Sequence, residues 1–189
     1  KGLDLAKGEY IARMDADDIS LPNRLEKQVK FMENNPEVGL LGTCVRTIGL
    51  EDNFDIKYME GHDQIRLKLL FDNYITHPTV MLRSEILKKN NLKYLDLLHT
   101  EDYALWVLLS NYAKIEILPE ILLHYRCHGN NISDLHKDFQ KKQTSIIRLQ
   151  QLVSFGLSDN ETSFQIFERF IDENTIENEN DFKILMEYI

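Results

Sequence analysis

Short apolar runs alternate with amphipathic patterns through the first 133 residues, and only helical patterns follow them. Residues 9–14 and 38–48 are rich in aromatic or β-branched side chains, which favour strands. Between those runs, residues 23–34 place apolar side chains at helical spacing. Such alternation is typical of a layered α/β structure. We therefore predict an α/β domain over residues 1–133 and a helical C-terminal extension over residues 134–189.

The remaining expected elements fit this plan. Residues 1–7 have helical character and Gly8 fits a helix stop, so the chain opens inside a helix with no strand before it. A complete α/β nucleotide-binding domain begins with a strand, and we expect the N-terminal part of such a domain to be missing here. Further helices are expected at 62–71, 84–90, 101–111, 135–153, 161–172 and 181–189, and further strands at 79–82, 115–118 and 121–125, the last two separated by Pro119 and Glu120.

The charge balance narrows the classes of partner. With 31 acidic and 22 basic residues the formal charge is -9, which disfavours nucleic acid or an anionic membrane as a general partner. Hydrophobic residues make up 43% of the chain, enough to bury a core. Cys44 and Cys127 lie in apolar, strand-like runs, which predicts buried free thiols and no disulfide framework. No apolar run reaches the ~18 residues of a membrane-spanning helix.

Three carboxylates crowd into four residues at the end of the first expected strand, at Asp15, Asp17 and Asp18. Each charge disfavours the ionisation of its neighbours, and a bound divalent cation relieves that repulsion. Oxygen ligands suit Mg²⁺ or Mn²⁺, and these ions also take oxygens from a substrate diphosphate. Ligands of open α/β sheets bind beyond the carboxyl ends of the strands, which is where this cluster lies. The cluster is therefore a candidate metal and nucleotide site.

Three other interpretations of this cluster compete with a metal site. The simplest is a solvated turn leading into the next helix, with Ser20 as its N-cap and Pro22 in its first turn. A calcium-binding loop counted from Asp15 is rejected, because Ile19 occupies a ligand position and Ser20 the position of the glycine turn. A haloacid-dehalogenase-type phosphatase also ends a strand in two aspartates, with Asp15 as nucleophile. That alternative stays open, although no downstream metal motif of its class is evident.

Five segments carry a more specific pattern, and they are residues 8–18 (GEYIARMDADD), 22–28 (PNRLEKQ), 77–81 (HPTVM), 100–106 (TEDYALW) and 125–128 (YRCH). In this order they resemble the family 2 glycosyltransferases of the GT-A fold, particularly bacterial enzymes of surface-polysaccharide assembly. The resemblance covers roughly residues 1–130, and the order of its motifs makes it more specific than any single motif.

The resemblance implies a GT-A-like, Rossmann-like mixed sheet flanked by helices. Asp15 and Asp17 match the family's Asp-x-Asp motif, which binds a nucleotide sugar through Mn²⁺ or Mg²⁺, with Asp17 as the closer metal ligand. Asp18 is expected beside the same donor. From its residue type, Arg13 is a candidate for steadying phosphate there, and ordinary pairing with nearby acids is the alternative. His128 lies where some members complete the diphosphate or metal site.

The same resemblance assigns the other side of the reaction. Asp102 matches the family's catalytic base and is preceded by Glu101, while His77 and Trp106 are expected on the acceptor side. The implied donor is a UDP-sugar, and the implied acceptor is a glycan or a lipid-linked molecule. The implied setting is the cytoplasm at the inner face of the membrane, with peripheral membrane association.

Taken without the resemblance, the residues support this chemistry less specifically. Inverting glycosyl transfer needs a base for the acceptor hydroxyl, and Asp102 begins an apolar helix whose N-terminus stabilises a carboxylate. Capping by Thr100 or Asp102 is the ordinary alternative. Taken alone, Trp106 is more often a core residue, His77 is more often a structural histidine, and His128 fits an exposed turn.

We therefore predict a metal-dependent, inverting glycosyltransferase that moves a sugar from a nucleotide-diphosphate donor in cell-surface polysaccharide biosynthesis. The haloacid-dehalogenase-type phosphatase is the alternative, and a non-enzymatic binding module is a third hypothesis. Donor-dependent release of a nucleoside diphosphate separates the first hypothesis from the other two.

Overall fold

The computed structural model describes residues 2–58, 61–97, 99–128, 137–157, 159–173 and 175–188. The chain divides into two compact units, residues 1–137 and 138–189. The domain boundary expected at residues 133 and 134 lies outside the described residues. None of the helices in the described ranges combines the length and the apolar character that a bilayer crossing requires.

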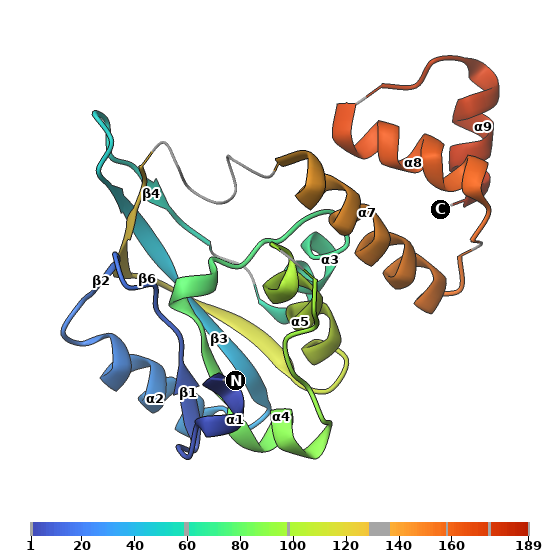
Figure 1. The fold of residues 1–189 in the computed structure, drawn as a ribbon. Helices are drawn as coiled ribbons and strands as arrows, with labels where there is room; N and C mark the ends of the chain where they lie inside the picture. Colours follow the sequence, from blue (N-terminus) through green and yellow to red (C-terminus); the bar gives the residue numbers. More distant parts are fainter. Residues whose placement is uncertain are drawn as a thin grey trace. The chain divides into compact units, whose positions relative to one another are not determined.

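A mixed sheet lies at the centre of the first unit (Figure 1). Its strands in the described ranges are β1 (Tyr10–Ala12), β2 (Ile19–Ser20), β3 (Val38–Ile48), β4 (Asp55–Ile56), β5 (Met81–Arg83) and β6 (Lys114–Arg126). They are ordered β1-β5-β3-β6-β2, with β4 paired to β3. β3 and β6 run parallel and the other pairs are antiparallel. β3 and β6 are thus the long central strands that hold the shorter ones in place.

Helices flank this sheet, and they are α1 (Gly2–Leu5), α2 (Arg24–Asn34), α3 (His62–Lys68), α4 (Ser84–Lys89) and α5 (Glu101–Leu109), with a 3-10 turn, η1, at His77–Thr79. Figure 1 shows α2 and α5 on opposite sides of the sheet. A core cluster joins Met32 of α2 to Val38, Leu41 and Met81 of the sheet. The predicted fold class, a GT-A-like mixed sheet flanked by helices, is confirmed by this architecture and by the solved structures described below.

Gly39 in β3 permits a close approach of α5 and the segment after it. A Cβ atom there would lie 2.6 Å from the Cβ of Ala113 and 3.3 Å from Cδ2 of Leu109. Any larger residue would push α5 away from the sheet, since closely packed interiors absorb such volume poorly. Glycine at this position therefore helps to fix α5, which begins at Glu101 and Asp102.

Two local expectations were wrong. Residues 114–126 form one strand and not two, because the partner register steps from Leu118 opposite Thr43 to Ile121 opposite Cys44. Pro119 and Glu120 bulge out of the ladder, which a residue without a backbone N–H tolerates. Ser20 is not a helix cap, since it lies in β2 and α2 begins after Asn23.

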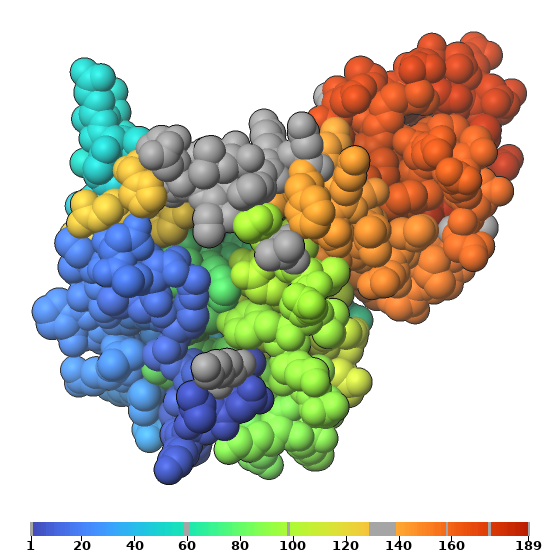
Figure 2. All heavy atoms as spheres, in the orientation of Figure 1, coloured from blue at the N-terminus to red at the C-terminus, as the bar shows by residue number. Residues whose placement is uncertain are grey.

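Residues 49–54, between β3 and β4, form a projecting tip of the first unit (Figure 2). The side chains of Leu50 and Phe54 on this tip are exposed. Both cysteines are free, as expected; Cys44 is buried, whereas Cys127 is partly exposed.

The second unit is helical in its described part, with α7 (Lys137–Ser154), α8 (Glu161–Glu173) and α9 (Glu179–Tyr188). Buried Arg148 of α7 donates to Glu168 Oε1 at 2.8 Å and to Asp172 Oδ1 at 3.0 Å in α8. Arg169 of α8 pairs with Asp181 of α9 at 2.5 Å. Ion pairs of this kind fix the helices of the unit to one another.

Candidate active site

The loop of residues 15–18 is held at both ends by the sheet. Before it, the Arg13 N–H donates to the Val80 carbonyl at 3.0 Å, which extends the ladder of β1 by one residue. After it, β2 pairs with β6, so the chain returns directly to the sheet. The loop is short, and the strands before and after it pair with β5 and β6. These pairings keep the carboxylates of the loop at one end of the sheet.

Asp18 anchors this loop to the end of β6. Its Oδ1 accepts the Arg126 N–H at 2.8 Å, and Arg126 Nε donates to the Asp17 carbonyl, also at 2.8 Å. Asp18 is only 7% exposed, and its Oδ2 has no hydrogen-bond partner in the described part of the chain. Burial raises the pKa of Asp18, and the charges of Asp15 and Asp17 add to that effect. Asp18 is therefore an internal anchor with one buried oxygen left over.

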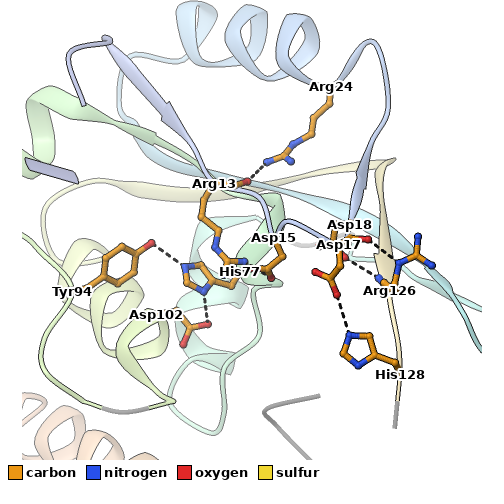
Figure 3. Close-up of polar contacts among 10 residues, drawn as sticks. All are labelled: Arg13, Asp15, Asp17, Asp18, Arg24, His77, Tyr94, Asp102, Arg126 and His128. Atoms are coloured by element: carbon orange, nitrogen blue, oxygen red, sulfur yellow. Dashed lines mark hydrogen bonds and ion pairs between the residues drawn. The ribbon is translucent and has the colours of Figure 1, made fainter. Parts of the chain in front are cut away.

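The other two carboxylates point to different partners (Figure 3). Asp15 makes a two-point ion pair with Arg13, at 2.5 Å and 2.6 Å. Asp17 lies 3.1 Å from Nε2 of His128, which is 111 residues away in the sequence. The hydrogen bond with His128 lowers the pKa of Asp17, so this exposed carboxylate is ionised at neutral pH. Alternate residues of one loop thus serve two separate contacts.

The Asp17–His128 pair fits a hard divalent cation. Its donor set is one carboxylate oxygen, the ligand type that suits Mg²⁺ and Mn²⁺, and one imidazole nitrogen, which suits the softer transition metals better than Mg²⁺. Side chains of Asp17 and His128 are about half exposed, at 47% and 54%. No group of three or more His, Cys, Asp or Glu side chains converges on one point in the described ranges. Two protein ligands suit an ion that takes its other oxygens from a substrate diphosphate.

Asp102 lies in a contrasting, enclosed environment at the N-terminus of α5. Its Oδ2 accepts a hydrogen bond from Nδ2 of Asn73 at 2.9 Å, and its Oδ1 accepts the Tyr103 N–H at 2.8 Å. Burial raises the pKa of Asp102, and the neighbouring charge of Glu101 raises it further. A carboxylate with a raised pKa is a better general base than an exposed one.

His77 lies beside Asp102 in η1, with Nδ1 3.6 Å from Asp102 Oδ2 and Nε2 2.9 Å from the Tyr94 hydroxyl. Burial lowers the pKa of His77 to about 3, and the charge of Arg13 acts in the same direction. The ring is therefore neutral at neutral pH, and its approach to Asp102 is not an ion pair. Trp106 packs edge-on against the ring, with centroids 5.6 Å apart. It is fully buried, so it supports His77 and offers no face to an acceptor.

A buried hydrogen-bond network of Arg24 and Gln28 links the two parts of the site. Arg24 of α2 donates to the Arg13 carbonyl at 2.8 Å and to Gln28 Oε1 at 3.0 Å. Gln28 in turn donates to the carbonyls of Leu41 at 3.0 Å and Thr79 at 2.9 Å. Arg13 precedes the aspartate loop and Thr79 ends the turn of His77. One pair of side chains therefore fixes both loops against β3.

The structure groups the predicted site residues in two sets. Asp17 and His128 form one set, and Asp102 and His77 form the other, with Asp15 and Arg13 paired to each other and Glu101 beside Asp102. Sequence patterns did not identify Asn73 or Tyr94, and they gave no role to Arg126 although it lies in the segment 125–128; all three act through contacts between distant segments. Arg24 and Gln28 lie in the segment 22–28 that carried the resemblance, and their helical i, i+4 spacing was the available signal.

Comparison with known proteins places this architecture in a family. Residues 1–90 match the family model described as glycosyl transferase family 2. An uncharacterized glycosyltransferase of Methanocaldococcus jannaschii, MJ1057, is 41% identical over 131 residues, covering 67% of this chain and 44% of that protein. The O-antigen biosynthesis glycosyltransferase WbnJ of Escherichia coli is 38% identical over 130 residues, covering 66% and 50%. The chain thus spans about half the length of these curated relatives.

A solved structure shares the fold at low sequence identity. The structure of S. aureus TarS aligns with a TM-score of 0.60 at 14% identity, covering 95% of this chain and 55% of that chain. A second TarS structure, in complex with UDP-GlcNAc, aligns with a TM-score of 0.59 at 15% identity, covering 98% and 58%. The fold, the family model and the relatives agree, and they set aside the phosphatase alternative. The chain belongs to glycosyltransferase family 2 and has the GT-A fold.

Proposed function

We propose that this chain carries the donor-metal and base residues of an inverting glycosyltransferase that uses a UDP-sugar. One observation carries the proposal: an exposed, ionised carboxylate beside an imidazole, at Asp17 and His128, lies in the same unit as a largely enclosed, hydrogen-bonded carboxylate at Asp102. Inverting transfer needs these two kinds of carboxylate, one to bind the donor and one to accept a proton.

Asp17 and His128 are the residues that would hold Mn²⁺ or Mg²⁺. When bound, the cation supplies Lewis-acid stabilisation of the charge on the departing diphosphate. Arg13 pairs with Asp15 beside the same loop, and we assign its guanidinium to the phosphate oxygens of the donor. Asp18 and Arg126 keep the loop against β6. These residues bind and orient the donor before any bond changes.

Asp102 is the proposed base. The acceptor hydroxyl oxygen attacks the anomeric carbon, the bond from that carbon to the diphosphate oxygen breaks, and the hydroxyl proton passes to Asp102. Attack from the face opposite the leaving group inverts the anomeric configuration. General-base assistance of this kind contributes about 10²–10⁴-fold to rate. Glu101 and His77 border the base, and His77 is the neutral polar group that an acceptor hydroxyl would meet beside it.

The acceptor is proposed to be a glycan or a lipid-linked molecule of cell-surface polysaccharide assembly, as the name of WbnJ suggests for that relative. For such an acceptor, we propose that the transfer takes place at the inner face of the membrane. The projecting tip at residues 49–54, with its exposed Leu50 and Phe54, is the surface of the catalytic unit that we assign to acceptor contact. Residues 134–189 are proposed to form a separate helical extension.

The test is hydrolysis and transfer from a panel of sugar nucleotides by the natural protein that carries this chain, with and without Mn²⁺. We expect metal-dependent release of a nucleoside diphosphate, lost in Asp17→Ala and in Asp102→Asn. The matched control is Asp63→Asn, which changes an exposed aspartate of α3 that belongs to neither set. Binding of sugar nucleotides without any turnover would instead support a binding module.

A further inference from the structure

We propose that Asn73 and Tyr94 are positioning residues that hold the Asp102 carboxylate in one orientation, Asn73 directly and Tyr94 through the ring of His77. This inference rests on the proposed role of Asp102 as the base. Neither residue belongs to a segment that the sequence pattern singled out. Both lie in irregular stretches that the fold brings to the N-terminus of α5.

Asn73 fixes one oxygen of Asp102. Its side-chain N–H donates to Oδ2 at 2.9 Å, while its own carbonyl oxygen accepts the Ile75 N–H at 3.3 Å. The second contact determines which end of the amide faces Asp102, so the donor and not the acceptor meets the carboxylate. Oδ1 accepts the Tyr103 N–H, so each oxygen of Asp102 accepts one hydrogen bond from the protein. A carboxylate oxygen accepts more than one hydrogen bond, and the remaining lone pairs stay available to an acceptor hydroxyl.

Tyr94 acts on the second neighbour of Asp102. A neutral imidazole carries one proton, and its position decides whether Nδ1 attracts or repels the carboxylate 3.6 Å away. A hydrogen bond donated by the Tyr94 hydroxyl to Nε2 leaves the proton on Nδ1, facing Asp102 Oδ2. The opposite tautomer would place a lone pair against the negative carboxylate. The ionised base therefore favours the Nδ1–H tautomer, and in that tautomer Nε2 accepts the hydrogen bond and the Tyr94 hydroxyl donates it.

Packing limits the alternatives open to this cluster. The ring of His77 is enclosed between Tyr94, 5.5 Å away, and Trp106, 5.6 Å away, measured between ring centroids. The charged groups that act on the cluster are Arg13, which affects His77 and Tyr94, and Glu101, which affects Asp102 and Tyr94. Burial raises the pKa of Tyr94 to about 12, so its hydroxyl keeps the proton that it donates.

Two variants separate positioning from ordinary packing. Asn73→Ala removes the donor to Asp102, and Tyr94→Phe removes one hydroxyl and leaves the ring. We expect the pKa of Asp102 to rise in both variants, and more in Asn73→Ala, measured from the carboxyl ¹³C signal assigned with Asp102→Asn. The ¹⁵N shifts of His77 should move from the Nδ1–H tautomer towards a mixture in Tyr94→Phe. The controls are Asn34→Ala and Tyr112→Phe, at exposed positions.

The same variants have a kinetic signature in the natural protein. We expect kcat to fall about tenfold in Asn73→Ala, as for loss of a partner that orients a functional group, with the KM for the donor unchanged. The acid limb of the pH–rate profile should move to higher pH as the pKa of Asp102 rises. An unchanged Asp102 pKa in both variants, together with an unchanged His77 tautomer in Tyr94→Phe, would overturn the inference. A wild-type protein without turnover contradicts the proposed function alone, because the two NMR readouts still decide the roles of Asn73 and Tyr94.

Discussion

The two acidic positions of the site differ in almost every physical respect. Asp17 is about half exposed, its pKa is lowered by the hydrogen bond with His128, and His128 is also about half exposed. Asp102 is largely enclosed, with 14% of its side chain exposed, its pKa is raised by desolvation, and its contacts are to the amide of Asn73 and a backbone N–H. The same side chain is thus prepared for two tasks by its surroundings, cation and phosphate binding in one place and proton transfer in the other.

The largest effect is expected from Asp102→Asn, which keeps the volume of the side chain and removes the base. The rate of transfer should fall by about 10²–10⁴-fold, the range that general-base catalysis contributes. The KM for the donor should stay unchanged, because Asp17 and His128 are untouched. Steady-state kinetics with Asp96→Asn as an exposed control will measure this. A similar loss of donor affinity would show that the two carboxylates do not have separate roles.

The second largest effect is expected from Asp17→Asn, which removes the charge of the proposed metal ligand and leaves Asp102 unchanged. Removing the charge beside His128 should weaken Mn²⁺-dependent donor binding by about tenfold or more, the scale reported for lost metal-site contacts. Calorimetric titration of the donor, with and without Mn²⁺, tests this directly. Equal donor affinity in Asp17→Asn and wild type would remove Asp17 from the proposed metal site.

A third variant, Arg24→Met, should damage both sites together. It replaces the guanidinium that holds the Arg13 carbonyl and Gln28 with an unbranched side chain of similar length. Losing hydrogen bonds from a charged donor is expected to destabilise the protein by about 1.5–3 kcal/mol. Chemical unfolding measures that loss, and kinetics should show both a higher donor KM and a lower kcat. Lys30→Met on the exposed side of α2 is the control and should change neither.

The smallest effect is the part of the pH dependence of stability that comes from Asp102. Because its folded pKa is raised, the folded protein binds this proton more tightly than the unfolded chain does. The stability linked to Asp102 is therefore present below the ordinary aspartate pKa and is lost as pH rises through the raised value. Asp102→Asn abolishes this dependence, so the stability of the variant relative to wild type should increase with pH across that window.

Unfolding measured at a series of pH values checks that slope. A constant difference between the two proteins would mean that the pKa of Asp102 is the same in the folded and the unfolded state. That outcome would also remove the contrast with Asp17, because the comparison depends on the raised pKa of the buried carboxylate.

Much of the architecture was predictable from local patterns. The alternation of apolar runs and helical spacing predicted the layered fold, since side-chain periodicity reflects which face of an element is buried. Pro119 misled the prediction of the last strand, because its effect depends on whether the partner strand can accommodate a bulge. Ser20 misled the prediction of a helix start, because pairing with β6 outweighed the capping preference of serine.

The sequence by itself determined the chemistry that is present: the Asp15–Asp17 pair at a strand end, Asp102 at a helix start, and the ordered motifs that identify the family. Only the tertiary structure decided how these groups differ. It placed His128 beside Asp17 across 111 residues, and Asn73, His77 and Tyr94 around Asp102. The physical reason is that ionisation and orientation depend on desolvation and on hydrogen-bond partners, and both are supplied by segments that are adjacent only in the folded chain.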